Sequence, residues 1–214
     1  MMGTAAINAL RTTMVTAPEA VRDDLAVLTP ARLIDTCRGL RPNPARLDDP
    51  VHGAKLALRT IARRIEAFDL EIRDLDRTLG SLVPEVVPAT LALLGIGVDH
   101  AGQLLVSAGR NPERLRSEAA FARLCGAAPM PASSGRTSRH RLSRGGDRQA
   151  NRALHMAVVV RMRRCPRTKA YVERRTAEGL SKPEIMRCLK RYLAREVYDA
   201  LQADLGALEG LDSI

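Results

Sequence analysis

The clearest pattern in the chain is a series of apolar residues spaced alternately four and three positions apart. The series is separated by Arg, Asp and Glu and comprises Ala54, Leu58, Ile61, Ile65, Phe68, Ile72, Leu75 and Leu79. This spacing places all these side chains on one face of a helix. An amphipathic helix packed on its own domain would show it, and so would a coiled coil within the chain or between chains. A strict seam of about four heptads favours the coiled coil.

Shorter helical patterns precede this long helix. Thr29 followed by Pro30 is typical of a helix cap and a first-turn proline, and this helix is expected to end near Gly39. Residues 41–50 contain three prolines, which predict an elbow. We therefore expect helical segments and a proline-rich elbow over residues 1–50, and a coiled-coil-like linker helix over residues 51–87.

Residues 88–205 are expected to form a second, compact helical domain, followed by a tail over residues 206–214. Apolar helical stretches flank Gly95 and Gly97. This arrangement is typical of a helix–hairpin–helix, in which a glycine turn lets backbone amides approach a DNA phosphate, although it also suits an ordinary tight turn. Ser181 and Glu184 form a capping box that opens a long last helix.

Composition supports a mainly α fold. Aromatic residues make up 2% of the chain and tryptophan is absent, so the core must be built from aliphatic side chains. Alanine and leucine favour helix, whereas the alternating β-branched runs of a sheet protein are scarce.

Positive charge is concentrated in one stretch of the chain. The formal net charge is +10, and residues 136–175 alone contain twelve arginines and one lysine against two acidic residues. Such a stretch indicates a polyanionic partner, either nucleic acid or an anionic membrane. No apolar run reaches membrane-spanning length, and the four cysteines lack zinc-site spacing, so we expect a cytoplasmic protein without a metal site.

The basic stretch follows directly on a stiff loop that carries two hydroxyl groups. Pro129 and Pro131 restrict the backbone, and Ser133 and Ser134 precede Gly135. Hydroxyl groups beside dense positive charge indicate a phosphate site, although a Ser-Ser-Gly sequence is often only a turn. The residues expected to bind DNA or RNA are Gly95, Gly97, Arg136, Arg139, Arg141, Arg144, Arg148 and Arg152. Asp147 is expected to cap the helix that follows.

Four motifs in this half of the chain resemble, in order and spacing, the C-terminal domain of the insertion-sequence-one-ten family of bacterial transposases. They are the Gly-Ile-Gly stretch of residues 95–105, the Asn-Pro-Glu stretch of 111–126, the Ala-Pro…Ser-Ser-Gly stretch of 128–135 and the Arg-Gly-Gly-Asp stretch of 144–155. The resemblance covers residues 88 to 201. It implies a DNA recombinase whose N-terminal resolvase-like domain holds Mg²⁺ through four acidic residues. It also implies a coiled coil for assembly and a structured guide RNA.

Carried onto this chain, the resemblance assigns the nucleophile that attacks the scissile phosphate to Ser134, with Ser133 as the alternative. The acidic N-terminal domain of the family has no counterpart in residues 1–87. We therefore expect a truncated transposase, inactive alone, with no metal or cofactor of its own and with Mg²⁺ used by the full-length enzyme. Its expected partners are DNA, a guide RNA and a second copy bound through residues 54–79. The alternatives are a non-catalytic, dimerising nucleic-acid-binding module and a structural coiled-coil adaptor.

Overall fold

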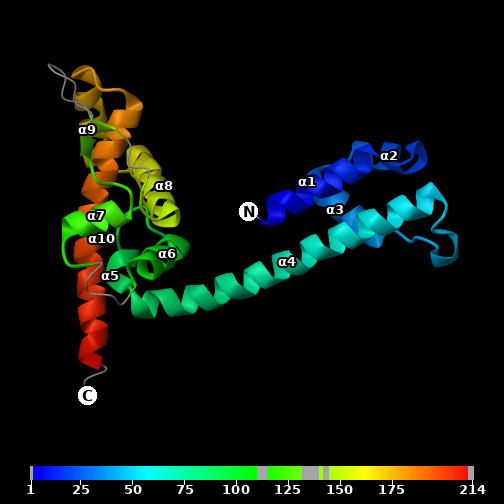
Figure 1. The fold of residues 1–214 in the computed structure, drawn as a ribbon, viewed down its shortest axis with the longest axis horizontal. Helices are drawn as coiled ribbons and strands as arrows, with labels where there is room; N and C mark the ends of the chain where they lie inside the picture. The colour runs from blue at the N-terminus through cyan, green and yellow to red at the C-terminus, as the bar shows by residue number, and fades with distance from the viewer. Residues whose placement is uncertain (1, 110–114, 132–139, 142–144, 212–214) are drawn as a thin grey trace. The chain divides into compact units, whose positions relative to one another are not determined.

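The computed structural model describes residues 2–109, 115–131, 140–141 and 145–211 (Figure 1). These residues are mostly helical, which confirms the predicted fold class. The chain divides into two compact units, Met1–Arg77 and Thr78–Ile214. The division lies inside the longest helix, α4 (Pro50–Val86), and within the range predicted for the linker helix.

The first unit packs three short helices on the N-terminal part of α4. They are α1 (Met2–Val15), α2 (Glu19–Ala26) and α3 (Pro30–Gly39), and the elbow contains one 3₁₀ turn, η1 (Pro44–Arg46). The helix predicted after Thr29 is confirmed at both ends. Side chains from all four helices form one aliphatic core, which includes Leu10, Val21, Leu25, Leu33, Leu58 and Ile65.

One half of the apolar seam of α4 is buried and the other half is exposed. Leu58 is fully buried and Ile65 is 3% exposed, both within the core of the first unit. Ile72 and Leu75, in contrast, are 49% and 57% exposed. The first half of the seam therefore packs on its own domain, and the second half leaves apolar side chains at the surface.

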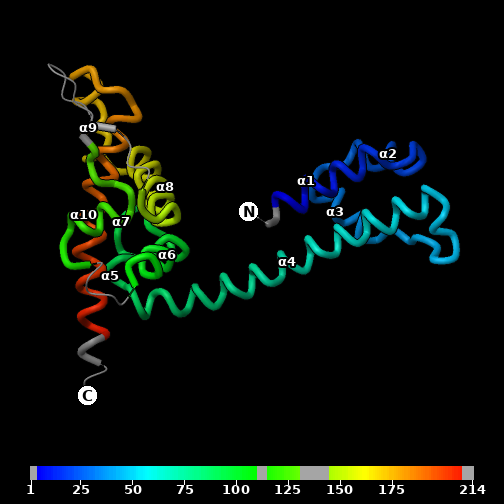
Figure 2. Tube along the Cα trace, viewed as in Figure 1, coloured from blue at the N-terminus to red at the C-terminus, as the bar shows by residue number. Residues whose placement is uncertain are grey.

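The second unit is built around the last helix, α10 (Lys182–Leu211). The tube in Figure 2 shows this helix with α5 (Pro88–Leu91), α7 (Glu118–Leu124) and α8 (Arg148–Arg164) beside it, and α10 contacts all three. Two further helices, α6 (Val98–Ala108) and α9 (Pro166–Ala177), pack on α8. The core between these helices is apolar and includes Leu104, Phe121, Leu154, Val158, Ile185, Leu193 and Val197.

Polar contacts fix the two ends of α10. At its start, the Glu184 carboxylate accepts a hydrogen bond from the Ser181 backbone N–H at 2.9 Å, as the capping box predicts. Near its end, the buried Asp204 carboxylate accepts hydrogen bonds from the N–H groups of Ala89 and Thr90 at the start of α5. The helix continues to Leu211, so residues 206–211 are helical where a tail was expected.

None of the helices in the described parts of the chain is both long enough and apolar enough to cross a membrane.

Candidate nucleic-acid interface

The two ends of the serine-containing segment meet in a short antiparallel pair. Strand β1 (Met130–Pro131) pairs with β2 (His140–Arg141), with Met130 opposite Arg141 and Pro131 opposite His140. The candidate residues between the strands or directly after them lie outside the described residues: Ser133, Ser134, Arg136, Arg139 and Arg144. The structure therefore defines how the segment is held at its base.

The first end of the segment leaves α7 through a glycine turn. Gly126 has a φ of +61°, a left-handed conformation in which glycine is unstrained. Beyond it, the N–H groups of Ala127 and Ala128 both donate to the carbonyl of Ala122, at 2.7 and 3.0 Å. This turn ends the helix and directs the chain into β1.

The second end returns to the same place through Gly146, which has a φ of +96°. A Cβ atom on this residue would lie 2.5 Å from the carbonyl oxygen of Leu124, so only glycine fits. The Asp147 N–H then donates to that same Leu124 carbonyl at 2.7 Å. Both ends of the segment are thus fixed to the last turn of α7.

Asp147 caps α8, as its position in the sequence predicts. Its Oδ1 accepts hydrogen bonds from the N–H groups of Gln149 and Ala150, at 2.7 and 3.1 Å. Its Oδ2 accepts a hydrogen bond from the Ser107 hydroxyl of α6 at 2.8 Å. The carboxylate therefore orients the start of α8 and joins it to α6. Burial, together with this nearby negative charge, raises the pKa of the Cys125 thiol to about 12.

A hydrogen-bonded pair, the half-buried Asn151 and the buried Lys190, supports the same turn. The Asn151 amide donates to the carbonyls of Cys125 and Gly126, at 2.8 and 3.1 Å, and its oxygen accepts from Lys190 Nζ at 3.0 Å. Lys190 is only 5% exposed, and burial together with the charge of Arg187 lowers its pKa. Sequence reasoning missed both residues. Asn151 stands inside a quoted motif, but nothing in the sequence connects it with Lys190.

Two further candidate arginines lie on the first turns of α8. Arg148 and Arg152 are four positions apart, so they share a face, and both are exposed. Within the described chain, neither has a carboxylate partner. His155 continues this face and is also exposed. Unpaired positive charge at a helix N-terminus opposes the helix dipole, and an anion bound there would offset that cost.

Gly95 and Gly97 have different surroundings. Gly95 has a φ of +91°, and a Cβ on it would lie 2.7 Å from the carbonyl oxygen of Ala157 in α8. The close approach to α8 therefore explains this glycine by packing. Gly97 is exposed at the N-terminus of α6, with no atom near its Cβ position. The preceding helix α5 has only four residues. A phosphate-binding hairpin at these glycines stays a prediction.

No cluster of three or more carboxylate, histidine or cysteine side chains that could hold a metal ion occurs among the residues whose placement is described. These residues therefore do not fit the Mg²⁺ ion that the resemblance implies for the full-length enzyme. The four cysteines are free thiols.

Comparison with known proteins confirms the resemblance that the sequence motifs indicate. Residues 91–173 match the model of the Transposase IS116/IS110/IS902 family. Over 150 residues the chain is 29% identical to "Insertion element IS900 uncharacterized 42 kDa protein" of Mycobacterium paratuberculosis. These residues make up 66% of this chain and 37% of that protein.

A second relative is "Insertion element IS110 uncharacterized 43.6 kDa protein" of Streptomyces coelicolor. It is 29% identical over 140 residues, which make up 64% of this chain and 34% of the relative. The chain thus spans little more than a third of the length of the curated relatives that it matches.

Proposed function

We propose that the second unit is the DNA-binding, serine-bearing part of a transposase. The observation that carries this proposal is the base of the serine segment. Inside the matched range, α7 and α8 hold both ends of a segment that contains Ser133 and Ser134, and α8 carries Arg148 and Arg152 on its first turns. A fixed base of this kind limits the positions that a hydroxyl nucleophile can take relative to a bound phosphate.

In the proposed reaction, Ser134 Oγ attacks the scissile phosphorus and becomes bonded to it. The bond from phosphorus to the departing strand's oxygen breaks, the serine proton passes to a base, and the departing oxygen is protonated. A serine hydroxyl needs such a base, and His140 is the candidate nearest in sequence. Arginines beside the phosphate would stabilise the charge that develops on its oxygens. No metal ligand is assigned to this chain.

The same proposal includes one further partner and a place of action. A structured guide RNA is a second polyanion that the basic segment could bind, and the protein would act on DNA in the bacterial cytoplasm, at the nucleoid. Both nucleic acids would bind mainly through their phosphates.

The proposal is tested by removing the two exposed charges at the start of α8. Arg148→Gln combined with Arg152→Gln is expected to weaken binding to duplex DNA of an element end by roughly tenfold, because two phosphate contacts are lost. Fluorescence anisotropy at one fixed salt concentration measures the affinity. Arg63→Gln with Arg73→Gln is the matched control, since both arginines are exposed on α4 in the first unit. Equal losses in the two variants would contradict the proposal.

A second candidate function, a dimerising nucleic-acid-binding module without catalysis, is favoured by the surface of α4. This helix leaves five large apolar side chains between 36% and 57% exposed: Leu70, Ile72, Leu75, Leu79 and Leu82. Three of them continue the heptad seam, as a second copy of the helix would require.

Replacing Leu75 and Leu79 by lysine is expected to convert a dimer into a monomer, because each lysine would place a charge in the apolar contact. Sedimentation velocity at micromolar concentration measures the change. Thr78→Lys is the control for added charge, since Thr78 is exposed on the same helix but outside the seam. If the chain without substitutions sediments as a monomer, this interface is ruled out.

A further inference from the structure

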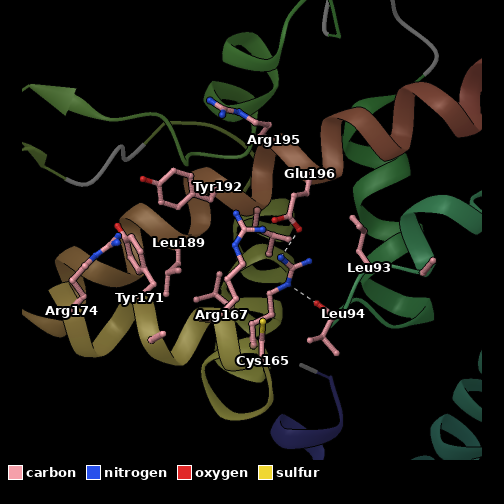
Figure 3. A pocket seen from close by; sticks show the side chains of 16 residues that line it. Leu93, Leu94, Cys165, Arg167, Tyr171, Arg174, Leu189, Tyr192, Arg195 and Glu196 are labelled. Atoms are coloured by element: carbon pink, nitrogen blue, oxygen red, sulfur yellow. Dashed lines mark hydrogen bonds and ion pairs between the residues drawn. The ribbon is translucent and has the colours of Figure 1, made fainter. Parts of the chain in front are cut away.

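A separate cleft opens between α8, α9, α10 and the turn after α5, with a volume of about 1130 Å³ (Figure 3). Its apolar lining includes Leu93, Leu189 and Leu193. Among the described residues, none of those that line it belongs to β1, β2 or the first turns of α8. The function proposed above therefore leaves this cleft without a role.

Two of the chain's three tyrosines line this cleft. Tyr198, the third, packs near Phe121 and donates its hydroxyl to the Leu115 carbonyl at 3.0 Å, as a core tyrosine does. Tyr171 and Tyr192 instead meet edge to face in the cleft, with ring centroids 5.7 Å apart. Tyr192 is 51% exposed. In a chain so poor in aromatic residues, an exposed ring in a cleft is a surface on which a flat ligand can stack.

The cleft is also basic, since its lining contains four arginines and one glutamate. Three of the four arginines are already engaged. Arg161 binds the Leu94 carbonyl at 2.7 Å and Glu196 at 2.5 Å, Arg195 pairs with Glu118 at 3.0 Å, and Arg174 lies 5.4 Å from the Tyr171 ring centre.

The fourth arginine, Arg167, is different. It is exposed at the start of α9 and has no carboxylate partner in the described part of the chain. Its guanidinium is therefore available to an anion, within the same cleft as the exposed Tyr192 ring.

We propose that this cleft binds one unpaired nucleotide of a single-stranded nucleic acid, with the base against Tyr192 and the phosphate at Arg167. An apolar lining, an aromatic face and a free guanidinium match the base and the phosphate of a nucleotide. A paired base cannot present its face to a side chain, because its neighbours in the duplex cover it. The cleft therefore selects single strands over duplex. The proposal goes beyond the serine chemistry and does not depend on it.

Binding of a short, fluorescein-labelled oligothymidylate to the whole chain tests the proposal. Tyr192→Ala is expected to weaken binding by about tenfold, the size of one lost base–aromatic stack, whereas Tyr192→Phe keeps the ring and stays within about twofold. Arg167→Gln is expected to lower the slope of log affinity against log salt by about 0.7, since one single-strand phosphate contact is lost.

Protection of Cys165 from alkylation shows whether the strand binds in the cleft. This thiol lines the cleft, and hydrogen bonds with Thr168 lower its pKa, so iodoacetamide can label it. The oligonucleotide is expected to slow labelling of Cys165 in the original chain and not in Tyr192→Ala or Arg167→Gln. Arg163→Gln is the control, because Arg163 is exposed on α8 but does not line the cleft.

Two results would overturn the proposal. One is equal affinity and equal Cys165 protection in the original chain and in both cleft variants. The other is full protection by thymidine monophosphate at the concentration at which the oligonucleotide protects, which would make a free nucleotide the ligand. Far-UV circular dichroism checks that the variants fold. Because Arg167 is exposed, Arg167→Gln carries the test if Tyr192→Ala does not fold.

Discussion

A chain with Ser134→Ala is expected to form no covalent adduct with DNA, a loss of at least about a thousandfold, while its DNA affinity stays within about twofold of the original. The substitution removes the atom that bonds to phosphorus but leaves every arginine in place. The substitution is therefore expected to abolish adduct formation without weakening DNA binding. This result distinguishes a nucleophile from a residue that only helps to hold DNA.

The assay combines the chain with Mg²⁺, labelled element-end DNA and the resolvase-like domain of a family member supplied in trans. A denaturing gel then shows whether the label stays attached to protein. Ser133→Ala is the matched control, because it removes the neighbouring hydroxyl and should leave the adduct intact. An adduct that survives in Ser134→Ala and disappears in Ser133→Ala would move the nucleophile to Ser133. An adduct formed by the chain without the added domain would contradict the expectation that this chain is inactive alone.

Gly146→Ala is expected to lower the free energy of unfolding of the second unit by about 3 kcal/mol. A left-handed backbone costs an alanine about 1–2 kcal/mol, and the clash with the Leu124 carbonyl adds to that cost. Because Asp147 donates to the same carbonyl, the clash also disturbs the base of the serine segment. Urea unfolding followed by circular dichroism measures the stability, and anisotropy measures the accompanying loss of DNA affinity.

The preceding glycine provides the control. A Cβ atom at Gly145 would meet no atom within 4 Å, so Gly145→Ala is expected to change the stability by less than about 0.5 kcal/mol. If the two substitutions destabilise the unit equally, the turn does not need the left-handed conformation at Gly146. The proposed base of the segment would then be wrong.

Local signals in the sequence predicted the elements that depend on nearby residues. Thr29 and Pro30 begin α3, Asp147 caps α8, and Glu184 reaches back to Ser181 at the start of α10. Pro30 fixes its own backbone, and the N–H groups that Asp147 and Glu184 cap lie within three residues of them, so a short stretch of sequence contains each of these contacts. The helical fold followed from composition for the same reason, since helix propensity is largely local.

The features that the sequence did not show depend on residues far apart in the chain. Lys190 reaches Asn151 across 39 positions, and Gly95 is fixed by the backbone of Ala157. The apolar periodicity of α4 identified its apolar face but not what covers it. The structure shows that the first unit covers this face only as far as Ile65. Periodicity indicates which side of a helix avoids water, and only packing shows the partner.

The most direct test of the central claim, that this chain binds DNA through phosphates at the base of the serine segment, is its DNA affinity as a function of salt concentration. The account predicts a slope of log affinity against log salt of about −4 or steeper, reduced in magnitude by about 2 in Arg148→Gln/Arg152→Gln. A slope near zero, or one that the double substitution leaves unchanged, would contradict it.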